Sequence, residues 1–207
     1  MRTLLFDFDG TIADSFTVVA EIFYTLTGHE RIEDPAVIAR LRKLPMTKVV
    51  KELHVPPLQI PRMLMKGRKM MSDHLHEVPV FKDIPETLLA LRENGYEMYI
   101  MSSNSTQNVQ RYLQITKLDT YFTKVYGGIG LLNKASAIRK VMRQNGMNRH
   151  DCVYIGDELR DVDGAKRAGV PMISVGWGYN DPELLASHHP DVLVMQPQEL
   201  LAAVEKV

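Results

Sequence analysis

Apolar residues follow two different patterns along the chain, and the change between them divides the sequence. Residues 3–8 are almost continuously apolar, which predicts a strand buried on both faces. Between about residues 14 and 78 the apolar positions recur at helical spacing instead. Amphipathic runs are predicted at about 15–27, from 35 onward, at 47–54 and at 61–75. We therefore expect one strand followed by a stretch that contains helices and no strand.

From Pro79 onward, short apolar runs alternate with helical patterns. The predicted strands are 97–101, 124–128, 152–157, 171–178 and 191–195. Asp83 and Glu86 have the spacing of a capping box and predict a helix that ends at Gly95. Strands that alternate with helices of about 10 residues indicate parallel pairing through right-handed crossovers. The predicted fold class is α/β, with a core of residues 1–13 and 80–207 and a helical insertion at 14–79.

Composition narrows the class of protein. The chain has 207 residues, 45% hydrophobic and 24% charged, as in an ordinary soluble globular protein. No apolar run approaches the roughly 20 residues of a membrane helix, and the first residues lack a secretory signal. A single cysteine, Cys152, fits a reducing compartment, so we expect a cytoplasmic location. The formal net charge of zero suggests neither a nucleic-acid nor a membrane partner, and nothing indicates an oligomeric state.

Polar residues stand at the ends of three predicted strands. Asp7 and Asp9 follow the first strand, Ser102 and Ser103 the second, and Asp157 a later one, with Asp161 four residues on. Lys134 begins a predicted helix. Because ligand sites in such sheets lie at the carboxyl ends of the strands, we expect these groups to share one crevice.

Four acids in one crevice repel each other, and a divalent cation would remove that repulsion. Ligands that offer only oxygen favour Mg²⁺ over Zn²⁺. The Lys134 amine, the Ser102 hydroxyl and the amides after it then suit a phosphoryl group. Asp7 is predicted to be a nucleophile and metal ligand, and Asp9, on the same side of a strand, a proton carrier.

The same residues carry a family resemblance. The segments "DFDGT", "YIMSSNS", "LLNKASAI" and "YIGDELRD" are similar, in this order, to the four motifs of the haloacid dehalogenase-like hydrolases. The resemblance implies a Rossmann-like core, Mg²⁺ dependence and phosphomonoester hydrolysis. It implies that Asp7, the Asp9 carbonyl and Asp157 hold the metal with support from Asp161. It also implies that Ser102, the Ser103 amide and Lys134 hold phosphate.

The helical insertion resembles the cap of the phosphoglycolate phosphatase-like branch. The cap is the expected source of specificity, because the core motifs offer little beyond phosphate binding. Within it, Arg42 and Lys43 are candidates for substrate contacts, although each suits a solvated helix end equally well. The basic residues of segment 39–70 would by default form a solvated face, and otherwise a positive lid over an anionic substrate.

The predicted function is phosphomonoester hydrolysis of a small phosphorylated metabolite. A β-phosphoglucomutase-like phosphomutase is the nearest alternative, and the sequence does not identify the substrate. A non-catalytic phospho-acceptor or binding protein is less favoured, because such a receiver domain would be shorter and the predicted catalytic residues are all present.

Overall fold

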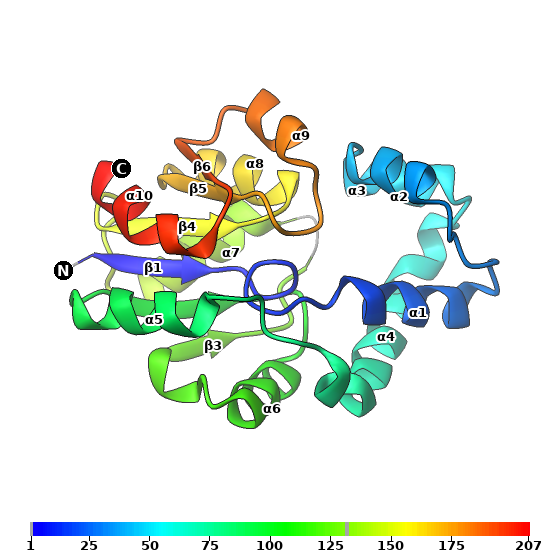
Figure 1. Ribbon diagram of the computed structural model, residues 1–207, viewed down its shortest axis with the longest axis horizontal. Helices are drawn as coiled ribbons and strands as arrows, with labels where there is room; N and C mark the ends of the chain where they lie inside the picture. Colours follow the sequence, from blue (N-terminus) through cyan, green and yellow to red (C-terminus); the bar gives the residue numbers. More distant parts are fainter. Residues whose placement is uncertain (1, 131–132) are drawn as a thin grey trace.

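The computed structural model describes residues 2–130 and 133–207. Its centre is one parallel sheet in the order β3-β2-β1-β4-β5-β6 (Figure 1). The strands are β1 Thr3–Phe6, β2 Glu97–Met101, β3 Lys124–Tyr126, β4 Cys152–Gly156, β5 Met172–Val175 and β6 Val192–Val194. The predicted α/β fold is confirmed; β2 has the predicted bounds, and the other predicted strands are present in a somewhat shorter form.

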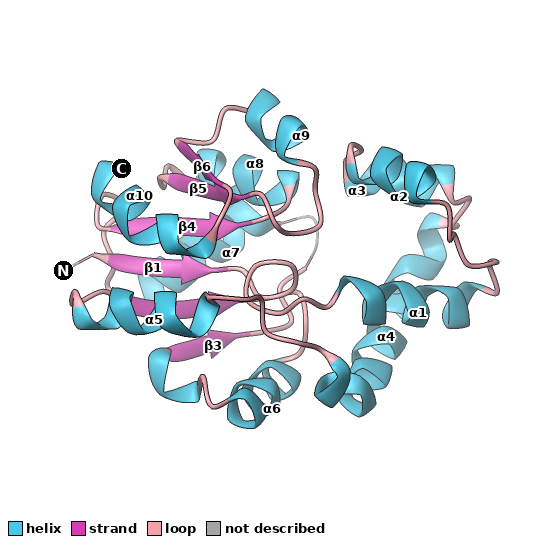
Figure 2. Ribbon diagram, in the orientation of Figure 1, coloured by secondary structure: helices cyan, strands magenta, loops and turns pink. Residues whose placement is uncertain are grey.

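Helices cover both faces of the sheet (Figure 2). They are α5 Ile84–Glu93, α6 Thr106–Thr116, α7 Lys134–Gln144, α8 Leu159–Ala168, α9 Pro182–Ser187 and α10 Leu200–Lys206. On one face, Leu4 and Phe6 of β1 belong to an apolar cluster shared with α5, α6 and α10. On the other face, Leu5 belongs to a cluster shared with α7, α8 and α9. Burial on both faces explains why β1 is continuously apolar.

The insertion contains only helices, as predicted, among the described residues. They are α1 Phe16–Thr27, α2 Pro35–Arg42, α3 Met46–Glu52 and α4 Ile60–His74, and they lie beyond the carboxyl ends of the strands (Figure 1). The two segments that connect the insertion to the rest of the chain lie side by side, because the backbone amide of Asp14 donates a hydrogen bond to the backbone carbonyl of Pro79. We call residues 14–79 the cap and the remainder the core, and this division stays a proposal.

One predicted local motif is wrong. Asp83 precedes α5 with a left-handed φ of 65° and makes no capping hydrogen bond with its side chain. Its carboxylate instead accepts a hydrogen bond from the Gln198 side chain at 2.7 Å. The spacing of Asp83 and Glu86 resembled a capping box because spacing does not report the backbone angles that a cap requires. None of the helices in the described residues is both long and apolar enough to cross a membrane.

Candidate active site

The three central strands bring most of the predicted site residues together. Strand β1 lies between β2 and β4, so the segments that follow these three strands meet at one edge of the sheet. Asp7 follows β1, Ser102 follows β2 and Asp157 follows β4. Lys134 opens α7, and Asp161 lies in the first turn of α8. All five residues are buried.

Three carboxylates form a buried cluster that can hold a divalent metal ion. Asp7, Asp157 and Asp161 each offer an oxygen, and these oxygens lie within 4.8 Å of one another. Asp7 Oδ2 has no hydrogen-bond partner among the described residues. A buried carboxylate oxygen is costly to leave unpaired, so this atom fits a position that faces a cation.

Lys134 compensates part of the acidic charge. Its Nζ lies 3.2 Å from Asp7 Oδ1 and 2.8 Å from Asp161 Oδ1. Burial by itself lowers the pKa of Lys134, but Asp161 and Asp7 together raise it above its ordinary value. Burial raises the pKa of Asp7 to about 7, against the opposing effect of Lys134. The ammonium of Lys134 alone therefore does not fully neutralise the negative charge of the three carboxylates.

Asp157 is held by groups that the sequence analysis did not single out. Thr11 Oγ1 donates to Asp157 Oδ1, and the Tyr179 amide donates to Oδ2, each at 2.7 Å. Burial and the Glu158 carboxylate raise the pKa of Asp157 well above its ordinary value, while the Tyr179 amide lowers it. These contacts fix the direction of the carboxylate toward the cluster.

Two glycines make room for Asp157. A Cβ at Gly10, whose φ is +81°, would overlap the Asp157 carboxylate. A Cβ at Gly178 would also overlap the Asp157 side chain and the Gly10 carbonyl oxygen. The turn after "DFDG" therefore needs glycine for its backbone angle and for its close approach. The pattern "DFDGT" signalled Gly10, but nothing local signalled Gly178.

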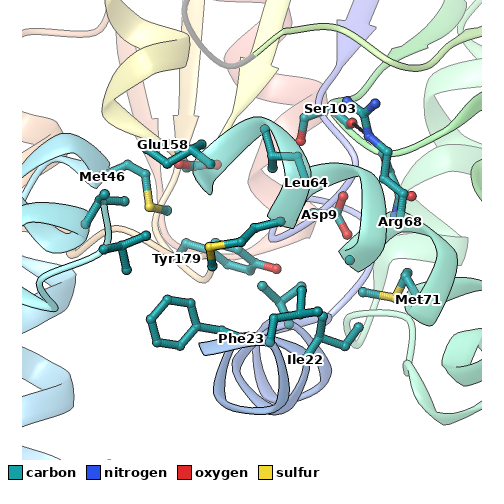
Figure 3. Close-up of a pocket in the computed structure, with 18 of the residues that line it drawn as sticks. Asp9, Ile22, Phe23, Met46, Leu64, Arg68, Met71, Ser103, Glu158 and Tyr179 are labelled. Carbon is teal, nitrogen blue, oxygen red and sulfur yellow. Dashed lines mark hydrogen bonds between the residues drawn. The ribbon is translucent and has the colours of Figure 1, made fainter. Parts of the chain in front are cut away.

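Asp9 lines a cavity below the cap (Figure 3). Ser15 Oγ donates to Asp9 Oδ1 at 2.8 Å and also lies 2.8 Å from the Tyr179 hydroxyl. Burial raises the pKa of Asp9, and the hydrogen bond from Ser15 lowers it in part. The Asp9 side chain is not part of the three-carboxylate cluster. A metal contact from Asp9 would therefore come from its backbone carbonyl, as the family resemblance implies.

Ser102 faces Asp9 across the site. Ser102 Oγ lies 3.5 Å from Asp9 Oδ2 and accepts a hydrogen bond from the Asn104 amide at 2.9 Å. Ser103 follows and lines the cavity. A separate residue, Ser105, caps α6 by accepting a hydrogen bond from the Asn108 amide. Ser105, and neither Ser102 nor Ser103, is therefore the residue that caps α6.

Asp161 also has a structural role at the start of α8. It is the third residue of α8, and its Oδ2 accepts a hydrogen bond from the Glu158 amide at 3.0 Å. Asp161 therefore completes a capping box with Glu158 and is not the N-cap itself. Its other oxygen faces Lys134, so one side chain both fixes the helix start and joins the buried cluster.

Arg160 is a charged residue of the site that the sequence analysis passed over. Its guanidinium pairs with Glu158 at 2.5 Å, and its Nε is buried with no partner among the described residues. Burial lowers the pKa of Arg160, but Glu158 and Asp7 raise it above its ordinary value. In the segment "YIGDELRD", the family resemblance assigns roles only to the acids Asp157 and Asp161. Nothing in the sequence pattern indicated a role for the arginine between them.

Arg42 and Lys43 do not line the cavity below the cap. The Arg42 guanidinium donates to the backbone carbonyls of Gly178 at 2.5 Å and Tyr179 at 3.0 Å. Lys43 forms an exposed ion pair with Glu183 at 2.7 Å. Both side chains therefore join the cap to the core, and their predicted contact with substrate stays a prediction.

Comparisons with known proteins agree with this geometry. The sequence model of the haloacid dehalogenase-like hydrolases matches residues 4–175. A phosphoglycolate phosphatase of Synechococcus elongatus is 32% identical over 100% of this chain and 99% of its own length. A phosphoglycolate phosphatase of Yersinia pestis is 24% identical over 99% of this chain and 93% of its own length.

A solved structure from Clostridium acetobutylicum, described as a predicted phosphatase, has the same fold. Its TM-score is 0.84 at 24% identity, with 100% of this chain and 99% of that chain covered. The predicted resemblance is thereby confirmed, together with the capped parallel-sheet fold. The chain belongs to the haloacid dehalogenase-like hydrolase family and is a phosphatase.

Proposed function

We propose that this phosphatase hydrolyses monoesters of small phosphorylated metabolites through an aspartyl phosphate on Asp7, with Mg²⁺ as the metal. The observation that supports this most directly is the environment of the Asp7 carboxylate. One oxygen faces Lys134 at 3.2 Å, and the other is buried beside two further acids, with no hydrogen-bond partner in the part of the chain that the structure describes. A carboxylate placed between an ammonium and a metal site is held ready to attack phosphorus.

The donor set suits Mg²⁺. The acids of the cluster, Asp7, Asp157 and Asp161, offer only oxygen, and the Asp9 carbonyl would add another oxygen. When bound, Mg²⁺ would offset the negative charge of the cluster and of the transferring phosphoryl group. A cation there would also lower the pKa of Asp7 from about 7 and so favour the carboxylate form needed for attack.

Asp7 and Asp9, the two acids that follow β1, have different roles in the proposed reaction. An Asp7 oxygen attacks phosphorus while the ester bond breaks, and Asp9 gives its proton to the departing oxygen. Asp9 then takes a proton from water, whose oxygen attacks the aspartyl phosphate and releases phosphate and Asp7. Burial raises the pKa of Asp9, which favours the protonated form that the first step needs.

Lys134, the Ser102 hydroxyl and the Ser103 amide are the proposed phosphate-binding groups. They lie around the same strand ends as Asp7, and Lys134 is only 4% exposed. Arg68 of α4 adds a cation from the cap, since its Nε donates to the Ser103 carbonyl at 2.8 Å. Phosphoglycolate, named in the relatives, is one substrate to test.

The proposal is tested by trapping the intermediate. Purified protein with Mg²⁺ should hydrolyse an aryl phosphate, and rapid quenching followed by borohydride reduction should modify Asp7 as judged by mass spectrometry. Asp14→Asn is a matched control, because Asp14 is an exposed acid near Asp7 and outside the cluster. Modification at another residue, or hydrolysis with no trapped intermediate, would refute the aspartyl phosphate on Asp7. A strict need for a sugar bisphosphate would instead favour a phosphomutase.

A further inference from the structure

We propose that the alcohol released by this phosphatase is uncharged and largely apolar, and that it binds in the cavity between the cap and the core. This inference rests on the proposed function, because the cavity matters only if Asp7 transfers a phosphoryl group. It concerns the part of the substrate that remains after the phosphate is bound.

The cavity starts at the catalytic residues and extends into the cap. Its volume is about 260 Å³, and its polar end contains Asp9 and Ser103. The opposite walls are apolar and come from the cap, with Ile22 and Phe23 on α1 and Leu64 on α4 (Figure 3). An ester held at Ser103 would therefore place its organic group against hydrocarbon.

Both basic side chains that line the cavity among the described residues already contact other groups of the protein. They are Arg68 and Arg160, beside the acids Asp9 and Glu158. Arg160 is paired with Glu158, and Arg68 lies against Ser103 at the phosphate end. A carboxylate on the organic group would lose its water and gain no free cation, which is costly in an apolar environment.

The basic residues of the cap do not alter this balance. Segment 39–70 carries nine of them, and Arg68 is the one among these described residues that lines the cavity. Of the other eight, Arg42 is half-buried and seven are exposed: Arg40, Lys43, Lys48, Lys51, Arg62, Lys66 and Lys69. The solvated-face interpretation therefore fits this segment better than a positive lid.

Some apolar side chains in the cavity wall are partly exposed. Val19 is 36% exposed and Met46 is 42% exposed, and both line the cavity. Covering such groups with an apolar ligand releases water and contributes about 25 cal/mol per Å². An apolar cavity of about 150 Å³ is enough for benzene, so the larger volume here suits a substituted ring or a short alkyl chain.

The experiment compares kcat/KM for four esters with the metal-loaded enzyme. They are phenyl phosphate, its para-propyl and para-carboxy derivatives, and phosphoglycolate. The propyl group should raise kcat/KM about tenfold or more, since each buried methylene contributes about 0.8 kcal/mol. The carboxylate should lower it about tenfold or more relative to the propyl ester, although it makes the phenolate a better leaving group.

Variants of cap residues test whether the cavity wall causes the preference for the propyl ester. Leu64→Ala and Met46→Ala should reduce the preference for propylphenyl over phenyl phosphate several-fold. Leu58→Ala is the matched control, because Leu58 lies in the cap, is 95% exposed and does not line the cavity. Met46 is partly exposed, so its truncation tests the proposal even if Leu64→Ala does not fold, and thermal unfolding checks each variant.

The outcomes separate the two proposals. All four esters could be hydrolysed with a preference for carboxyphenyl over propylphenyl phosphate, or for phosphoglycolate over phenyl phosphate. Either preference would overturn the inference and leave the proposed function standing. The same would follow if Leu58→Ala changed the propyl preference as much as Leu64→Ala. Hydrolysis of none of the esters would overturn the proposed function and the inference with it.

Discussion

The core and the cap bury their apolar side chains to very different extents. Every residue of β1, β4 and β5 is buried. In the cap, α4 has one buried residue, Met71, and α2 and α3 have none within the described chain. The core is thus packed before any ligand binds, while much apolar surface of the cap faces the cavity. The difference suggests that chemistry depends on the core and selectivity on the cap.

The largest effect is expected at the nucleophile. Asp7→Asn should preserve the fold and reduce kcat by about 10³-fold or more, because an amide is a poor nucleophile for phosphorus. Steady-state hydrolysis of an aryl phosphate measures this, with Asp14→Asn as the control. Retention of more than about a tenth of wild-type kcat, a barrier change below roughly 1.4 kcal/mol, would reject the role.

Metal removal should be nearly as damaging. EDTA should abolish hydrolysis and Mg²⁺ should restore it, while Ca²⁺ should inhibit because its larger and looser coordination misplaces the reacting groups. Asp157→Asn should raise the Mg²⁺ concentration needed for half-activity. Full activity in EDTA would contradict the proposed metal site.

The effect of Asp9 should depend on the ester. Asp9→Asn should slow the reaction by about 10²–10⁴-fold for poor leaving groups, because proton donation is lost. The loss should be smaller for aryl phosphates with good leaving groups. Rates across a series of leaving groups measure this, provided that phosphorylation of the enzyme limits them. Equal losses across that series would argue against Asp9 as the general acid.

Stability should separate the two regions directly. Leu88→Ala in the core should lower the free energy of unfolding by about 2–5 kcal/mol, because Leu88 is fully buried. Leu58→Ala in the cap should change it by less than about 0.5 kcal/mol. Urea titrations of both variants provide the comparison. A large loss from Leu58→Ala would show that the cap contributes to global stability more than its burial indicates.

The smallest effect on catalysis is expected where the cap joins the core. Arg42→Ala should lower kcat/KM by about 10–150-fold for all esters alike, since it loses charge-assisted bonds to Gly178 and Tyr179. Lys43→Ala, which removes an exposed ion pair, should change little. A loss confined to one metabolite ester would instead support the substrate contact that the sequence predicted for these residues.

Sequence patterns predicted the core better than the region around the site. The apolar run at Leu4–Phe6 and the strand-final acids predicted both the sheet and the meeting of Asp7 with Asp157. Periodicity cannot show that the Tyr179 amide holds Asp157 or that Gly178 makes room for it, because these contacts join separate segments of the chain. For the same reason the unpartnered Nε of Arg160 and the apolar cavity became visible only in the folded chain.

The central position of β1 has a consequence for folding. Thr3 pairs with both Glu97 and Cys152, so the strand that leads to Asp7 has partners that are synthesised much later. At about 5–20 residues per second, a ribosome needs roughly ten to thirty seconds to add the second partner. An apolar strand left unpaired for so long is prone to aggregate, and such distant pairing also slows folding. We therefore expect the yield of active enzyme to depend strongly on chaperones during synthesis.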